Sequence, residues 1–507
     1  MHRSTQSAFG AAVLILCLTS PVQAAPKEAG TLGASQLLQA KAGDPVEQAL
    51  QAMNKAARYY HDTVSTRGGY LMEYTADLTR RFGELPARES QIWVQNPSTP
   101  GMGDAFLNAC QASGDLFYLR CAEDAARALI WGQMECGGWN YLIDFAPGSL
   151  KTWYKEMSVH TDYGEFMHFN GNATFDDGAA RDPALLLLRL YDLTLDPAWL
   201  GPLKKALNFI MEAQFPNGAW PQRYPLIGTD YDTYYTYNDG VISGNIRVMA
   251  QAYKTLCDPR YLEAARRGAD FIIISQHEGP QYGWGQQLTY DMKPAQAREY
   301  EPASLSVTDT VDNLRCLMDM YELTGDRRYL EPVPRTLDWL DRTVSSDGRI
   351  GTFIEEGTNR TLAAKFEGDS GTMASVRITY NLAEAMGGYG FEQKNFSTAR
   401  ERKRYESLKS AVWKDPLAGK PTPLTPEAAL KRAQGMEPEI KRIIAALDSL
   451  GRWTEDGRMY TARYCFKNEM EYEGPVMKNG WIRTGTCIRN LNRLAEYVRL
   501  MKEGRNK

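Results

Sequence analysis

The sequence predicts an all-α protein in which repeated helical hairpins form an (α/α)-barrel-like toroid, with short irregular loops forming its cleft. Two observations predict this class. Four segments share one layout, in which an Asp opens a second helix and a Gly followed by an aromatic or apolar residue comes about 24 residues later. The 507 residues are 43% hydrophobic and 24% charged, an ordinary globular composition with enough apolar residues for a large core.

The repeat is clear enough for its copies to be delimited. The four copies run from Asp115 to Trp139, Asp196 to Trp220, Asp258 to Trp284 and Asp326 to Ile350, and weaker copies end at Tyr70 and Trp453.

Each part of the repeat has a physical role. The corner Asp is a good N-cap, and Pro197 or Pro259 follows it in the first helical turn, where a missing N–H costs nothing. Leu200, Leu203 and Leu207 recur at helical spacing, and the Gly ends the helix. Six such hairpins can stack as a solenoid or close into a toroid. A toroid would gather the Gly-aromatic loops around one mouth lined by Trp and Tyr, unless these aromatics only pack the core.

The chain divides into four predicted parts. Residues 1–24 read as a signal peptide, with Arg3, an apolar stretch and Val-Gln-Ala ending at Ala24, so we expect export to the periplasm or the extracellular space. Residues 25–395 form the toroid and catalytic domain, 396–435 a charged helix and Pro-rich connection, and 436–507 a C-terminal helical segment that packs back on the toroid. No later stretch approaches 18 apolar residues, so no membrane span is expected.

Composition and missing motifs exclude several classes of function. The net charge of −4 gives no basic field for nucleic acid. There is no GxSxG elbow, Walker loop, HExxH or Rossmann fingerprint, and only five His occur. The cysteines show no CxxC pattern; most are expected to be buried thiols, although a Cys465–Cys487 bridge is open. We expect a monomer.

Polar motifs instead lie on the loops between hairpins. The first, Phe-Asp-Asp-Gly, holds Asp176 and Asp177 before a helix. Paired carboxylates beside Gly can bind Ca²⁺ or act as acid and base, and the alternative is an ordinary helix start.

The second loop is denser in polar groups. It holds Trp220, Arg223, Tyr237, Asn238 and Asp239 around two helix boundaries. Arg and aromatic residues beside acidic ones suit a sugar acid, although Asp239 alone could be a helix cap.

A third loop follows the third hairpin. It offers Lys293, Arg298 and Tyr300, and Arg298 could clamp a carboxylate with two hydrogen bonds. Arg360 and Arg377 stand in weaker context further along the chain.

These motifs resemble a known family. FDDGA, GAWPQRYP, TYNDG, AREYEPASLS and ALDSLGRW are similar to motifs of the pectic acid lyases, the pectate lyases with an all-helical toroid. The resemblance covers about residues 100–395, with a weaker echo over 440–495. It implies anti β-elimination on an acidic polysaccharide. Ca²⁺, bound either before the substrate or only together with it, and cationic side chains would stabilise the charge that develops.

The resemblance also assigns roles to residues. We expect the metal ligands to be Asp176, Asp177 and Asp239. We expect the substrate-binding residues to be Trp220, Arg223, Tyr237, Asn238, Lys293 and Tyr300, and the catalytic candidates to be Arg298, Arg360 and Arg377.

The sequence departs from the family at three places. Asp177 stands where the family has Asn, and Arg181 replaces a Thr. Where the family has an Arg-rich stretch that supplies its arginine base, this chain has Met386 and Gly387. Two alternatives therefore stay open: a glycoside hydrolase that uses two carboxylates such as Asp177 and Asp239, and a non-catalytic carbohydrate-binding relative.

Overall fold

The computed structural model describes residues 43–158, 171–366, 376–385, 390–418, 423–460 and 472–505. Residues Pro45–Lys507 form one compact unit, and the predicted signal peptide lies outside the described residues. The α-helices are α1 (Pro45–Tyr59), α2 (Thr99–Ser113), α3 (Leu116–Trp131), α4 (Ser149–Met157), α6 (Arg181–Thr194), α7 (Leu200–Glu212), α8 (Val241–Leu256), α9 (Pro259–Ile274), α10 (Val307–Thr324), α11 (Val333–Thr343), α12 (Ala399–Ser410), α13 (Pro426–Ala445) and α14 (Thr484–Arg505).

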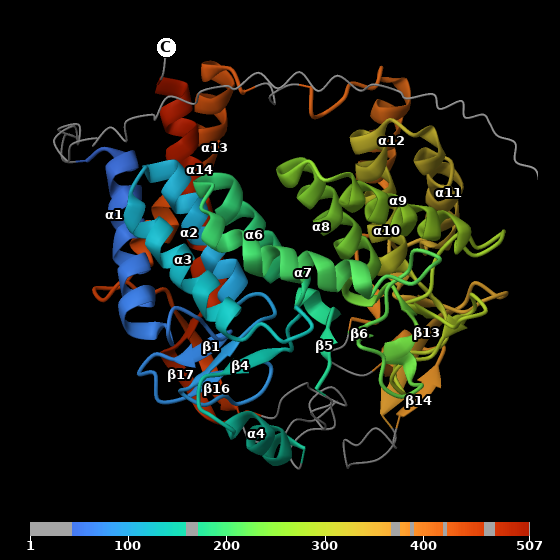
Figure 1. Ribbon diagram of the computed structural model, residues 1–507, viewed down its shortest axis with the longest axis horizontal. Helices are drawn as coiled ribbons and strands as arrows, with labels where there is room; N and C mark the ends of the chain where they lie inside the picture. Colours follow the sequence, from blue (N-terminus) through green and yellow to red (C-terminus); the bar gives the residue numbers. More distant parts are fainter. Residues whose placement is uncertain are drawn as a thin grey trace, which may run out of the picture. The chain divides into compact units, whose positions relative to one another are not determined.

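The helices of this unit alternate between two layers. In one layer α14, α2, α6, α8, α10 and α12 pack in that order, each against the next. The other helices pair with them, as α13 with α14, α3 with α2, α7 with α6 and α9 with α8. Figure 1 shows α2, α6 and α8 following one another in this way. The predicted fold class, an (α/α) arrangement of repeated helical hairpins, is confirmed.

The corner aspartates cap helices as the repeat predicts. The side chains of Asp115, Asp196, Asp258 and Asp326 each accept a hydrogen bond of 2.8–3.0 Å from the backbone N–H two residues further on. At Asp196 and Asp326 the capped turn is a short 3₁₀ helix, η3 (Pro197–Trp199) or η6 (Arg327–Leu330), that leads into α7 or α11.

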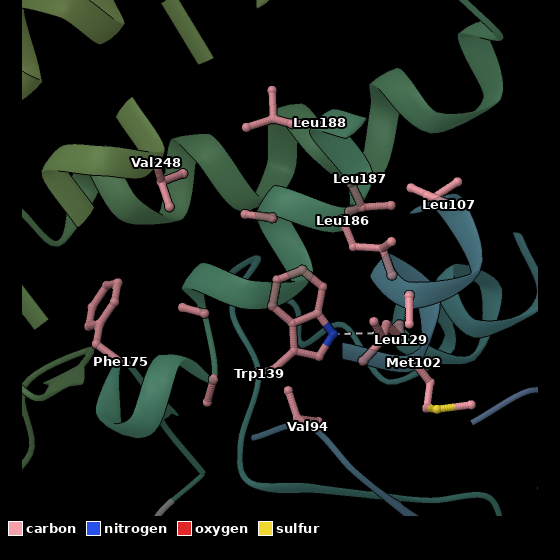
Figure 2. Packing of buried hydrophobic residues seen from close by; sticks show 14 of the residues in the cluster. Val94, Met102, Leu107, Leu129, Trp139, Phe175, Leu186, Leu187, Leu188 and Val248 are labelled. Carbon is pink, nitrogen blue, oxygen red and sulfur yellow. Dashed lines mark hydrogen bonds between the residues drawn. The ribbon is translucent and has the colours of Figure 1, made fainter. Parts of the chain in front are cut away.

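The tryptophans that follow the repeat glycines are core residues. Trp139, Trp220, Trp284 and Trp453 are at most 3% exposed. Each indole Nε1–H donates to a backbone carbonyl near the end of the preceding helix, at Leu129, Ile210, Ile272 and Ile443. Figure 2 shows the Trp139 indole directed at Leu129, with Leu186 and Leu187 of α6 packed beside it. These aromatics therefore lock each helix to its loop, and they do not line an open mouth.

The repeat glycines explain how one hairpin seats on the next. Gly68, Gly137, Gly218 and Gly451 all have φ between 86° and 102°. We call α1, α3, α7, α9, α11 and α13 the outer helices. A Cβ on each of these glycines would lie within 2.6 Å of a backbone carbonyl oxygen of the next outer helix, at Asp124, Lys205, Arg267 and Lys55 respectively. Such a close approach requires glycine. The same contact thus links α13 to α1, α1 to α3, α3 to α7 and α7 to α9.

The connections between helices carry short antiparallel strands (Figure 1). The strands are β1 (Glu73–Thr75), β2 (Arg81–Phe82), β3 (Gln91–Trp93), β4 (Leu142–Asp144), β5 (Ala173–Thr174), β6 (Arg223–Tyr224), β7 (Tyr235–Thr236), β8 (Gln287–Leu288), β9 (Pro294–Ala295), β10 (Leu305–Ser306), β11 (Ile350–Gly351), β12 (Phe353–Ile354), β13 (Thr361–Phe366), β14 (Val376–Thr379), β15 (Glu392–Gln393), β16 (Thr454–Tyr460) and β17 (Tyr472–Arg483). Neighbouring connections pair through them, for example β5 with β6 and β7 with β8. These pairings hold the loops of successive hairpins side by side.

Two remaining expectations concern the surface and the thiols. Among the described residues, no helix is both long and apolar enough to cross a membrane. Cys465 lies outside the described residues, and Cys487 is a buried free thiol.

Candidate functional site

Three carboxylates from two successive loops meet at one point. Asp176 and Asp177 belong to the 3₁₀ turn η2 (Asp176–Gly178) before α6, and Asp239 belongs to η5 (Asn238–Gly240) before α8. One oxygen from each carboxyl lies within 4.8 Å of the others. The sequence-predicted metal ligands are therefore brought together, and we call these three residues the acidic cluster.

The cluster forms because two hairpins use the same turn. Asp177 has φ 48° and ψ 23°, and Asp239 has φ 53° and ψ 23°. Each is followed by a glycine that also has positive φ, Gly178 or Gly240. Asp is one of the few residues that tolerate this left-handed conformation, because its short polar side chain bonds locally. Since α6 and α8 are neighbours, the two turns contact each other.

Hydrogen bonds fix each member of the cluster. The Tyr141 hydroxyl donates to Asp176 Oδ2 at 2.7 Å, and Gln95 Nε2 donates to Asp177 Oδ2 at 2.7 Å. Asn238 Nδ2 donates to Asp239 Oδ2 at 2.6 Å, and Gln286 Nε2 in turn donates to Asn238 Oδ1 at 2.9 Å. The carboxylates are thus pre-oriented rather than loose at the surface.

The cluster holds an excess of negative charge. Asp176 is buried, whereas the carboxyls of Asp177 and Asp239 reach solvent. The protein packed around Asp239 raises its pKa well above the usual value by desolvation, the charges of Asp176 and Asp177 raise it further, and Arg298 lowers it. A bound cation would relieve the same repulsion.

The residues present fit a calcium ion on chemical grounds. Ca²⁺ takes carboxylate and amide oxygens as ligands, and the cluster offers three carboxylates. Asp176 is 2% exposed, and apart from the protonated carboxyl of Asp239 no described group donates a hydrogen bond to its Oδ1 atom. A buried carboxylate oxygen without a donor is costly, and a metal ion would satisfy it.

Arg298 is the cation that acts on the cluster from the third loop. Its charge favours the ionised form of Asp239. Its Nη1 donates to the Tyr300 hydroxyl at 2.6 Å, and its Nε lies 3.4 Å from Glu301 Oε2. Glu301 is only 1% exposed, so its ion pair with Arg298 holds the guanidinium in a fixed position.

Arg223 is a buried cation whose charge interacts with Asp176. It is 6% exposed, and its guanidinium carbon lies 5.3 Å from the centre of the Tyr141 ring. Burial opposes the charge of Arg223, but Tyr141, Tyr154 and Asp176 outweigh it and raise its pKa. Arg223 therefore remains a cation, and it stabilises the negative charge of Asp176.

The predicted substrate-binding aromatics are not open to a ligand in this structure. Trp220 and Tyr300 are 0% exposed and Tyr237 is 2% exposed. The Tyr237 hydroxyl is 2.5 Å from Ser275 Oγ, and its ring stacks on Phe271. These side chains support the loops from inside. Sequence spacing shows only that an aromatic follows a glycine, not on which side its ring packs.

The remaining predicted cations lie at the surface. Lys293 is exposed and pairs with Asp291 at 2.7 Å. Arg360 lies with its guanidinium carbon 3.3 Å from the centre of the Tyr380 ring, and Arg377 is 4.0 Å from Glu384. Met386 and Gly387 lie outside the described residues.

Sequence reasoning missed Tyr141, Gln95 and Gln286, which hold the cluster. The repeat itself carried a usable signal. Tyr141 and Gln286 each stand two residues after a repeat tryptophan, Trp139 or Trp284. Arg181, where the sequence departs from the family, lies against both turns. One guanidinium nitrogen would be 2.3 Å from a Cβ added to Gly178, and the other would be 3.5 Å from a Cβ added to Gly240.

Known proteins resemble this chain in structure and, over part of its length, in sequence. No curated protein matches the chain by sequence. Among solved structures, a mutant of the family 10 polysaccharide lyase from Cellvibrio cellulosa, in complex with trigalacturonic acid, is similar at 18% identity and a TM-score of 0.43, over 61% of this chain and 98% of that chain. A family 76 glycoside hydrolase from a bovine Bacteroides thetaiotaomicron strain is similar at 11% identity and a TM-score of 0.44, over 91% of this chain and 78% of that chain.

A family comparison is more specific than these structural likenesses. It relates the part of the chain that holds the acidic cluster and Arg298 to enzymes that act on polysaccharides. Residues 133–370 match the model of the pectic acid lyase family, which confirms the resemblance that the loop motifs predicted.

Proposed function

We propose that this protein is an exported polysaccharide lyase that cleaves pectate or a related polyuronate by Ca²⁺-assisted anti β-elimination. The observation that carries the proposal is the acidic cluster, with its ligand atoms within 4.8 Å of one another and Arg298 acting on it. The cluster falls inside the part of the chain that matches the pectic acid lyases. Export rests on the predicted signal peptide alone.

The chemistry of β-elimination explains this set of groups. A base removes the C5 proton beside the uronate carboxylate, negative charge spreads onto that carboxylate, and the 4-linked sugar leaves. Asp176, Asp177 and Asp239 would hold Ca²⁺, which, when bound, would help to neutralise the uronate carboxylate. Tyr141, Gln95 and Asn238 keep the three carboxylates in place.

Arg298 is the best candidate for a catalytic residue among the three predicted arginines. Its charge acts on Asp239, whereas Arg360 and Arg377 have exposed side chains engaged with Tyr380 and Glu384. A guanidinium gives up its proton only with difficulty. We therefore assign Arg298 to binding the uronate carboxylate and stabilising the charge that develops there, as a preorganised cation does.

Incubation with polygalacturonate, with and without Ca²⁺, tests the reaction. The expected result is ultraviolet absorbance of the unsaturated product that requires Ca²⁺. Calorimetry tests the metal site separately: Asp239→Asn should lose measurable Ca²⁺ binding. Asp258→Asn is the matched control, because Asp258 caps α9 away from the cluster and Asn caps a helix equally well. Equal Ca²⁺ affinity in both variants would remove the metal assignment.

One observation favours a second candidate, a glycoside hydrolase. The pKa of Asp239, raised by burial and by the charges of Asp176 and Asp177, is the arrangement that general acid catalysis uses. The same incubation separates the two reactions, because hydrolysis yields reducing ends without the absorbance of an unsaturated sugar.

A further inference from the structure

An exposed tryptophan marks a surface that the acidic cluster does not use. Trp131, the last residue of α3, is 55% exposed. Its ring lies 4.7 Å from that of Phe145, centre to centre, at an angle of 52°. The guanidinium carbon of Arg67 lies 5.0 Å from the centre of the same Phe145 ring. We call Arg67, Trp131 and Phe145 the aromatic patch.

The scaffold does not require Trp131. In each hairpin, the repeat tryptophan donates its indole N–H to a helix carbonyl, and Trp131 stands two residues after that carbonyl. In the other three hairpins the equivalent residue is Glu212, Ile274 or Ala445. Because a polar, an aliphatic and a small side chain occupy the equivalent places, the packing of the hairpins does not explain the large aromatic ring of Trp131.

Arg67 is equally unexplained by the scaffold. It precedes the repeat glycine Gly68, where the other hairpins have Cys136, Asn217 and Leu450. Its φ of 50° is rare for arginine, because the Cβ is strained in the left-handed region. Among the residues that the structure describes, no carboxylate forms an ion pair with Arg67, so its charge is available to a ligand.

The aromatic patch is built on the same kind of connection as the acidic cluster. Phe145 lies in the connection from α3 to α6, which also carries Asp176 and Asp177. Arg67 lies in the connection from α1 to α2. β3 of the α1–α2 connection pairs with β4 of the α3–α6 connection, so these two connections lie side by side. We expect a long polymer bound at the cluster to extend along these loops to the patch.

We propose that the aromatic patch is a second binding site for an anionic polysaccharide, outside the acidic cluster. The exposed indole offers a flat apolar face for a sugar ring, and Arg67 offers a cation for its carboxylate. Phe145, 7% exposed, supports both. The choice of a polyuronate rests on the proposed function, and the unpaired charge of Arg67 supports it independently.

Affinity electrophoresis of the full chain through gels with polygalacturonate tests the proposal, in an Asp239→Asn background that removes cleavage. Trp131→Ala should weaken retardation, with an apparent Kd about tenfold higher, and Arg67→Ala should weaken it several-fold. Ile274→Ala is the matched control, because Ile274 occupies the equivalent place at the end of α9 and is 64% exposed. It should leave retardation unchanged. With Asp239 intact, turnover of a trisaccharide should be unaffected by Trp131→Ala.

The outcomes separate this site from the proposed function. Unchanged retardation of the Trp131→Ala and Arg67→Ala variants, or equal retardation by neutral mannan and polygalacturonate, would overturn the second site. Absence of retardation in the parent protein would do the same. If no uronan is cleaved but retardation still depends on Trp131 and Arg67, the lyase proposal fails and the second site stands.

Discussion

At the scale of single residues, burial decides which carboxyls titrate in an unusual range. Asp309, in the first turn of α10, is 6% exposed. Burial, with the nearby charges of Asp312 and Glu301, raises its pKa to about 7, although the Ser306 hydroxyl lowers it in part. The folded protein therefore holds a proton on Asp309 at pH values where the unfolded chain has lost it.

This proton makes stability depend on pH. Because the folded-state pKa is raised, the contribution of Asp309 is full at low pH and is lost as pH rises from about 4 to about 7. The free energy of unfolding should fall by up to about 1.4 kcal/mol per pH unit in that window. Asp309→Asn cannot titrate, so its thermal midpoint should change less between pH 5 and pH 8 than that of the parent protein. Parallel curves would contradict the shifted pKa.

A second residue-scale prediction concerns the three candidate catalytic arginines. Arg298→Ala should lower kcat on polygalacturonate by about 10²–10³-fold, the usual cost of removing one charge-stabilising group. Arg377→Ala should lower it by less than about threefold, since Arg377 is half exposed and pairs with Glu384. The comparison requires equal thermal midpoints in both variants. A larger loss in Arg377→Ala would move the catalytic role to the β13–β14 hairpin.

At the scale of elements, the repeat works through contacts between backbones. The glycine that follows α1, α3, α7 or α13 lies against a backbone carbonyl of a neighbouring helix. At Gly137, Gly218 and Gly451, the indole two residues later also bonds back to its own helix. One tripeptide thus joins a helix to its loop and to the next hairpin. This explains why Gly and Trp recur at a fixed spacing while the helices between them vary.

Two glycines on neighbouring segments test this reading. A Cβ at position 218 would lie 2.1 Å from the Arg267 carbonyl oxygen, and φ is +100°, so Gly218→Ala should cost more than about 2 kcal/mol. At Gly201, in the first turn of α7, nothing lies within 4 Å of the added Cβ. Gly201→Ala should therefore gain up to about 1 kcal/mol. Denaturant unfolding measures both, and equal effects would refute the packing role of Gly218.

At the scale of the whole unit, the two ends of the described chain are joined. α14 packs between α13 and α2, and β17 pairs with β1, so residues after 423 complete the layers that begin at α1. The family match ends at residue 370, well before these elements. The matched region is therefore not expected to fold alone.

Truncation after residue 422 tests this expectation. Removing α13 and α14 exposes the faces of α1 and α2 that pack against these two helices. The truncated protein should lose its cooperative thermal transition. Adding a peptide of residues 423–505 should restore it in part. A truncated protein with an unchanged transition would show that the first hairpins do not depend on the last.

The sequence by itself determined the hairpins, their corner caps at Asp115 and Asp258, and the family to which residues 133–370 are related. These features are local, since a cap or a helix end depends on residues a few positions apart. It also indicated Asp176, Asp177 and Asp239, because their motifs precede helices in successive hairpins.

Only the tertiary structure decided which side chains face the site. Trp220 and Tyr237 turned out to be core residues, and Tyr141 and Gln95 turned out to hold the acidic cluster. The direction of a side chain on an irregular loop depends on what packs against it, which spacing along the chain does not encode. The acidic cluster exists because α6 and α8 are neighbours, and that adjacency is a property of the assembled layers.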